Sequence, residues 1–359
     1  VLKLTEVPEV VQFVVSGVAI IPLAGLMGKA TEHLAHRLGP GIGGLLNATF
    51  GNAAELILAM FALFKGLDEV VKASLAGSIL GNLLLVFGAS LLAGGLRHPM
   101  QRFNRTAASA GNTMMVLAAL GLLMPALFHR LLDDQQLAKV QAVRLEHELS
   151  LGVALVLILA YGLTLLFTLV THRGLFNETE ELPANSHVEV VWGVRKAAAV
   201  LLVATAFVAL MSEMLIGTVE AAGETLGLTH VFMGVIVVAI IGNAAEHSSA
   251  VLVAMKNQMD LAVGIAMGSA LQIALFVAPV LVFVSYLRAE PLDLVFTTIE
   301  IIAVIISVLI AWMVAHDGES NWLEGAMLLL LYLILAIVFF ELPEAREFVN
   351  ASQIPPPAH

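Results

Sequence analysis

The pentapeptide Gly51-Asn52-Ala53-Ala54-Glu55 occurs twice in this chain, because Gly242-Asn243-Ala244-Ala245-Glu246 repeats it 191 positions later. The same ungapped shift places Gly77-Ser78 on Gly268-Ser269. Two separated motifs rarely agree at one offset by chance. The sequence therefore predicts that one structural unit has been duplicated and that each copy carries a glutamate at an equivalent place.

The composition limits the class of protein. Hydrophobic residues make up 59% of the 359 positions and charged residues only 13%, whereas about 25% charged residues is usual in a globular domain. A helix needs about 20 apolar residues to cross a hydrocarbon layer about 30 Å thick. Runs of this kind recur along the whole chain, and a soluble protein would lack the polar surface to cover them. The chain has no cysteine, which excludes disulfides and thiolate metal sites.

Ten apolar runs are predicted to span the membrane. They cover Val10–Met27, Ile42–Phe64, Ser74–Gly95, Ala107–Phe128 and Leu149–Val170 in the first copy, and Ala197–Leu215, Val231–Ala254, Leu261–Leu287, Leu292–Val314 and Trp322–Phe340 in the second. Five spans per copy is an odd number, so the second copy enters the membrane from the opposite side, as in many secondary transporters. The predicted fold is an all-α polytopic membrane protein with two inverted-topology repeats of five transmembrane helices.

The predicted organisation divides at the least apolar connection, which carries several glutamates. Residues 1–172 are expected to form the first transmembrane repeat, and residues 173–195 an acidic connecting loop. Residues 196–342 then form the second, inverted repeat. Residues 343–359, which end in a proline-rich stretch, are expected to be a flexible tail.

Glu55 and Glu246 are the candidate functional residues. An ionisable group at membrane depth costs at least about 2.5–3.5 kcal/mol, so such residues are rare and usually functional. A purely structural carboxyl, protonated or paired with a base, is the alternative for either residue alone. Identical pentapeptides at symmetric places favour a shared functional site.

The neighbouring residues predict a site for a hard cation. Asn52 and Asn243 precede the glutamates by three positions, so amide and carboxylate share one helix face. Gly51 and Gly242 allow each helix to open and expose backbone carbonyls. Carboxylate, amide and backbone oxygens are the ligands that calcium takes, whereas soft ligands are missing.

Two carboxylates also match the charge of a divalent ion. When that ion leaves, two negative charges remain close together in a medium of low dielectric, which favours their protonation as a coupled pair. Protons then compete with the metal for the same oxygens. The sequence thus outlines an exchange mechanism, with two protons per calcium ion as the hypothesis for its stoichiometry.

The span after each pentapeptide supplies further polar groups: Ser78 and Asn82 in the first copy, Ser269 and Gln272 in the second. Serines are common as packing contacts between membrane helices, so a functional and a packing role stay open for both. The amides are costlier to bury, which favours function.

At these residues the chain resembles the calcium/proton antiporters of the cation/calcium exchanger superfamily. The resemblance is carried by Asn47–Ile57 and Gly242–His247, with Pro22–Ala24 and Ala30–Glu32 ahead of the first motif. It implies that Glu55 and Glu246 bind the ion, that Gly51 and Gly242 offer carbonyls, and that Asn52 and Asn243 complete or support the site. Sodium/calcium exchangers typically differ at these motifs, which favours protons as the coupling ion.

The family usually has eleven spans, the extra one preceding the repeats. Because the chain begins with Val1, one N-terminal helix is expected to be missing from it. The connection between the copies is short, which suggests a prokaryotic type. The expected location is therefore a prokaryotic cell (inner) membrane, or a vacuolar-type membrane if the source is eukaryotic.

Further acids and one histidine are candidates for a proton or entry path. His247 follows Glu246 directly, and could relay protons or only pack. Glu32 and Glu213, with Glu220 and Glu300, either line a path or face water.

The predicted function is secondary active exchange of Ca²⁺, or another divalent cation, for H⁺ by alternating access. A Na⁺/Ca²⁺ exchanger of the same fold is the alternative, and a passive cation channel is a weaker one. No nucleotide loop, paired-histidine zinc motif or nucleophile motif occurs, so an enzyme is not expected. The expected partners are calcium ions, protons and the lipid bilayer, with no cofactor and no nucleic acid.

Overall fold

The computed structural model describes residues 7–134, 139–172 and 192–342. In chain order the first half contains α1 (Glu9–Phe50), α2 (Ala53–Phe64), α3 (Asp68–Leu80), the π-helix η1 (Gly81–Val86), α4 (Phe87–Gly95), β1 (Gln101–Arg102), α5 (Arg105–Asp134), α6 (Lys139–Leu166) and the π-helix η2 (Phe167–Thr171). The second half contains α8 (Val194–Leu226), α9 (His230–Phe232), the π-helix η3 (Met233–Val238), α10 (Ala239–Ala254), α11 (Met259–Gln272), the π-helix η4 (Ile273–Val277), α12 (Ala278–Ser285), α13 (Thr298–Ala315), β2 (Glu319–Ser320) and α14 (Trp322–Glu341).

The expectation of an all-α polytopic membrane protein is confirmed. Nine helices in the described part of the chain are long and apolar enough to cross a membrane, and α2 is a shorter apolar helix. Most run past the predicted ends, because a helix continues into the polar residues beyond the hydrocarbon layer. The strands β1 and β2 form one short antiparallel ladder that the sequence did not predict. The predicted connecting loop and tail lie almost wholly outside the described residues.

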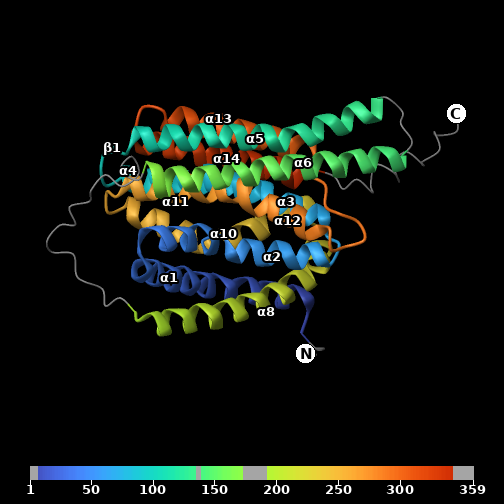
Figure 1. The fold of residues 1–359 in the computed structure, drawn as a ribbon, viewed down its shortest axis with the longest axis horizontal. Coiled ribbons are helices and arrows are strands. Elements are labelled where there is room, and N and C mark those ends of the chain that lie inside the picture. Colours follow the sequence, from blue (N-terminus) through green and yellow to red (C-terminus); the bar gives the residue numbers. More distant parts are fainter. Residues whose placement is uncertain (1–6, 135–138, 173–191, 343–359) are drawn as a thin grey trace.

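The second predicted span, Ile42–Phe64, is wrong as a single helix. Its first part belongs to α1, which ends at Phe50, and its second part is α2, which begins at Ala53. A side-chain carbon at Gly43 would overlap the backbone of Ala35, although residues eight apart in a straight helix are separated by about 12 Å. α1 therefore bends sharply between these two residues, and the chain turns back toward α2 (Figure 1).

The ninth predicted span also begins too early. The sequence predicts Leu292–Val314, but α13 starts only at Thr298, where Thr297 and Glu300 form a capping box. Leu292 and Leu294 precede the helix and are buried. Their backbone N–H groups donate to the hydroxyls of Ser285 and Ser150, at 2.8 and 3.0 Å. This stretch is apolar because it is buried, not because it is helical.

The two halves are arranged as inverted copies. Asp68, at the start of α3, accepts hydrogen bonds from Arg288, just beyond the end of α12, at 2.6 and 3.1 Å. In the other half of the arrangement, Asp260 at the start of α11 accepts a hydrogen bond from the backbone N–H of Asn104, which lies beyond the end of α4. The pair α3–α4 thus runs antiparallel to its counterpart α11–α12. The π-helices η1 and η4 interrupt both pairs at equivalent positions, and such π-segments are frequent at functional sites.

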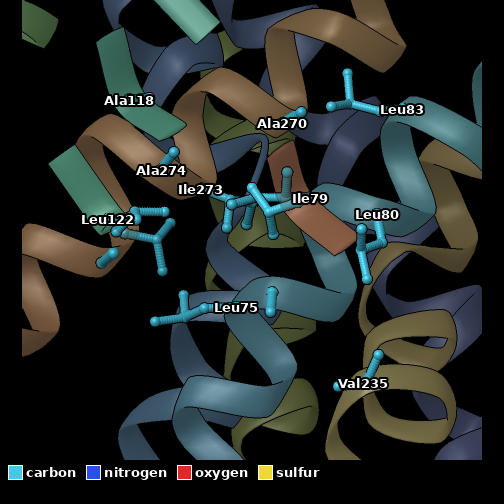
Figure 2. Close-up of a cluster of buried hydrophobic side chains, with 14 of the residues drawn as sticks. Leu75, Ile79, Leu80, Leu83, Ala118, Leu122, Val235, Ala270, Ile273 and Ala274 are labelled. Atoms are coloured by element: carbon cyan, nitrogen blue, oxygen red, sulfur yellow. The ribbon is translucent and has the colours of Figure 1, made fainter. Parts of the chain in front are cut away.

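The core lies where these two helix pairs cross. Figure 2 shows Leu75, Ile79 and Leu83 of the first copy packed against Ala270 and Ile273 of the second, all buried. α5 adds Ala118 and Leu122 from one side. In contrast, α1 and α8 pack against each other along one edge of the molecule (Figure 1). The crossing pairs form the rigid centre on which a site can be built.

We predict that Gly77→Ala destabilises the protein, while the equivalent change in the other copy, Gly268→Ala, does not. A side-chain carbon at Gly77 would overlap the backbone of Val235, whereas nothing lies within 4 Å of one at Gly268. Overpacking of this kind costs about 1–3 kcal/mol, while alanine in an open helix is favourable. Thermal unfolding in detergent measures both effects, and equal melting temperatures for the two variants would contradict this packing.

Candidate cation site

The first pentapeptide forms a break between two helices. Gly51 and Asn52 lie in a turn, and Asn52 has φ −101° and ψ 27°, outside helical geometry. α2 begins directly afterwards, with the backbone carbonyl of Asn52 accepting from Leu56 N at 3.0 Å. Glu55 is therefore in the first turn of α2, where its side chain is buried. The glycine opens the helix here as predicted.

The second pentapeptide behaves differently. Gly242, Asn243 and Glu246 all lie inside the continuous helix α10. The carbonyl of Gly242 is thus in regular helix, where it accepts from the residue four positions on. The chain thus breaks a helix at Gly51 but not at Gly242, and the role of the two carbonyls as ligands stays a prediction.

The two glutamates lie on helices that contact each other, α2 and α10. An ideal side-chain carbon at Gly242 would lie 3.4 Å from Glu55 Cγ and 3.9 Å from its carboxyl carbon. Glu55 thus packs against α10 one turn before Glu246. Glu246 lies on this same helix and belongs to the second copy.

Each carboxylate has one oxygen without a partner. Glu55 Oε2 and Glu246 Oε2 are buried and have no hydrogen-bond donor among the described residues. Burying an acceptor without compensation costs free energy, more so for a charged group. These oxygens are therefore positioned to bind either a cation or a proton.

A network of amides and hydroxyls lies beside the carboxylates. Asn82 Nδ2 donates to Asn243 Oδ1 at 3.0 Å and to Ser269 Oγ at 2.9 Å. Asn243 Nδ2 donates to Ser78 Oγ at 2.9 Å. Each of these bonds joins a residue of one copy to a residue of the other.

The same pattern continues at the helix break. Ser269 Oγ donates to Asn52 Oδ1 at 2.9 Å, and Asn52 Nδ2 donates to Gln272 Oε1. All six predicted polar neighbours are thus brought into one cross-copy network. Asn82 Oδ1 is buried and accepts no hydrogen bond from the described residues.

A small cavity adjoins Glu55. Its lining comes from five elements, α2, α3, η3, α10 and η4, and includes Leu58, Ala59, Leu75, Ser78, Val238, Ala239, Gly242, Ile273 and Val277. Ser74, one turn from Ser78 on α3, also faces it. Sequence reasoning missed Ser74, although the spacing of four residues between two serines in an apolar span was the available signal.

The remaining candidates fall outside this arrangement. Glu32 and Glu213 are exposed on α1 and α8 and are not joined to the network. Glu300 caps α13. His247 is half-buried beside Glu246, with its Nε2 buried and unpartnered among the described residues. No group of three or more potential metal-ligating His, Cys, Asp or Glu residues occurs in the described part of the chain.

A helical membrane protein of two inverted copies, with one carboxylate of each at their contact, has the architecture of a secondary transporter. The family model described as sodium/calcium exchanger protein matches residues 9–170 and 196–341. The chain therefore belongs to the sodium/calcium exchanger protein family. The resemblance found in the sequence is confirmed.

Several individual proteins are similar to this chain over nearly its whole length. The chain is 47% identical over 351 residues to a Ca(2+)/H(+) antiporter of Aphanothece halophytica, covering 94% of this chain and 92% of the relative. It is 46% identical to the Ca(2+)/H(+) antiporter ChaA of Bacillus subtilis, with 93% of each chain covered. The solved structure of native YfkE is 43% identical, with a TM-score of 0.79 and 95% of each chain covered.

We predict that Ser269→Ala lowers the free energy of unfolding by about 1 kcal/mol, because it removes two interhelical hydrogen bonds worth about 0.6 kcal/mol each in a membrane. Ser90→Ala is the matched control, since Ser90 is also fully buried but its hydroxyl has no partner among the described residues. Chemical denaturation in detergent compares them. A larger loss for the Ser90 variant would contradict the proposed network.

Proposed function

We propose that this protein exchanges Ca²⁺ for H⁺ across a membrane by alternating access. The observation that carries the proposal is the packing of Glu55 against Gly242, one turn before Glu246. Each of these two acids, one from each inverted copy, has a buried oxygen without a donor among the described residues. The names of the relatives at 46–47% identity support the same pair of ions. The chain is a multi-pass membrane protein, and we expect a prokaryotic cell membrane as its location.

In the calcium-bound state the two carboxylates neutralise the charge of the ion. Calcium takes six to eight oxygens at about 2.3–2.6 Å, so other groups must contribute. Asn52 and Asn243 supply amide oxygens or orient the site, Gly51 supplies a backbone carbonyl at the helix break, and Gly242 does so only if α10 opens. Ser78, Asn82, Ser269 and Gln272 hold these groups in place across the two copies.

In the proton-bound state the same two oxygens carry protons. Removing calcium leaves two anions together away from water, an arrangement that is too costly to persist. Protonation makes the empty site neutral, which allows it to reorient without a net charge. The exchange is thus a competition for oxygen atoms, and it requires no cofactor and no catalytic residue.

Sodium is the alternative coupling ion, because the family description names sodium and calcium together. The pentapeptides and the relatives' names favour protons. Calcium uptake into proteoliposomes under an imposed pH gradient or an imposed sodium gradient separates the two. Uptake against the calcium gradient also distinguishes an exchanger from a passive channel.

We predict that Glu55→Gln and Glu246→Gln each reduce proton-driven ⁴⁵Ca²⁺ uptake to the level of protein-free liposomes. Each change removes one charge from a site that has two. Glu213→Gln is the control, since this glutamate is also in a membrane helix but is exposed. Uptake that survives in both site variants would overturn the proposal.

We further predict that the apparent affinity for calcium falls as the pH is lowered. Each proton that calcium must displace weakens binding about tenfold per pH unit, so two protons give at most about 100-fold. The initial rate of uptake at several calcium concentrations and pH values measures this slope. An affinity that does not change over the pH range in which the unaltered protein transports would contradict proton competition.

A further inference from the structure

A cluster of cationic side chains lies where α1 and α8 meet at one end of the molecule. Lys29, His33 and Arg37 follow each other at intervals of four residues on α1, and so share one face of the helix. Arg195 and Lys196 lie in the first turn of α8. His36 is also on this part of α1. In a chain of formal net charge −11, such a concentration of positive charge requires an explanation.

Trp192 is the centre of this cluster. The ring of His33 stacks on it with centroids 4.6 Å apart, and Lys196 Nζ lies 4.7 Å from the indole centroid. Arg37 Nε donates to the Trp192 carbonyl at 3.4 Å. Two side chains thus contact the indole of Trp192 and a third contacts its backbone carbonyl, which ties α1 to the start of α8.

The cationic side chains of the cluster are accessible from outside the protein. Lys29, Arg37, Arg195 and Lys196 are exposed, while Trp192 is half-buried. Within the described residues, no carboxylate forms an ion pair with Lys29, Arg195 or Lys196. Glu32 is the one acidic residue on the same two turns of α1. In the part of the chain that the structure describes, three of the cluster's exposed cations thus have no carboxylate partner.

The lengths of the apolar runs on α1 and α8 place the cluster at the membrane surface. The candidate span Glu9–Leu38 contains 30 residues, or about 45 Å of helix, which exceeds the hydrocarbon thickness by about 15 Å. The apolar run Val10–Met27 fills the hydrocarbon layer, and Lys29 follows it immediately. On α8, Lys196 comes directly before the apolar run that starts at Ala197. Tryptophan beside lysine and arginine at such a boundary is typical of the headgroup region.

We propose that the ends of α1 and α8 form a binding site for the headgroup of an anionic phospholipid, with the phosphate between Arg37, Arg195 and Lys196 and the indole of Trp192 at the glycerol level. The first N–H groups of α8, which no side chain caps, add donors for the same phosphate. The site holds together two helices that pack along one edge of the fold (Figure 1). This inference does not depend on which ions the protein exchanges.

The test uses Trp192 as a reporter. The chain has three tryptophans, so Trp312→Phe with Trp322→Phe leaves Trp192 alone. Its fluorescence is measured in phosphatidylcholine vesicles that contain equal fractions of headgroup-spin-labelled phosphatidylglycerol or phosphatidylcholine. We expect stronger quenching by the anionic lipid, and no reversal when inorganic phosphate is added. Equal quenching by both lipids, or reversal by free phosphate, would overturn the proposal.

Charge variants supply the second arm. Arg195→Gln/Lys196→Gln is expected to lower the preference for phosphatidylglycerol about 30-fold, from the contribution of two charges near an anionic surface. Arg97→Gln/Lys256→Gln removes two exposed cations outside the cluster and should keep the preference. Native mass spectrometry of the protein with all its tryptophans gives an independent count of retained lipid. Equal loss in both double variants would mean that only the overall charge matters and would refute the site.

Discussion

Two carboxylates on membrane helices, at the contact between two inverted copies, are the constraint around which this protein is built. Anions close together and away from water are stable only with a cation or with protons between them. Glu55 packs against Gly242 of α10, one turn before Glu246, so the two acids lie at one contact between the copies. The crossing of α3–α4 with α11–α12 then holds the two halves in register, and the amide and hydroxyl network fixes the polar groups at that crossing.

The two copies are equivalent in sequence but not in conformation. The helix is broken at Gly51, whereas α10 continues through Gly242. Glu55 is buried, while Glu246 is only half-buried. An alternating-access cycle needs one state open to each side of the membrane. If the two inverted copies exchanged their broken and continuous helices, the site would have the same geometry toward the opposite side. The duplication thus supplies both the site and the means of presenting it to either side.

Much of this arrangement could be predicted from the sequence. The ten apolar runs fix the class of fold, because backbone in lipid must be helical. The shared offset of the pentapeptides identifies the two glutamates. Ser78, Asn82, Ser269 and Gln272 can be identified because they are polar residues in the otherwise apolar span that follows each pentapeptide. These predictions depend on the free-energy cost of burying a polar group, which makes a polar residue inside an apolar run a candidate for function.

What the sequence could not give depends on tertiary contacts. The segment that contains Leu292 and Leu294 is as apolar as a membrane helix but is a buried connection. It can be buried because the hydroxyls of Ser285 and Ser150 accept hydrogen bonds from its backbone N–H groups. Identical pentapeptides cannot reveal that one breaks a helix and the other does not. Glu32 and Glu213 have the same composition around them as buried acids, yet they face outward, because helix rotation is set by packing between helices.

The most direct test of the central claim is to count the protons released when calcium binds. Isothermal titration calorimetry in two buffers of different ionisation enthalpy gives this number for the purified protein. The account predicts a release that approaches two protons per calcium ion at low pH and declines as the pH rises, since two carboxylates exchange one kind of ligand for the other. Calcium binding at low pH without any release of protons would contradict it.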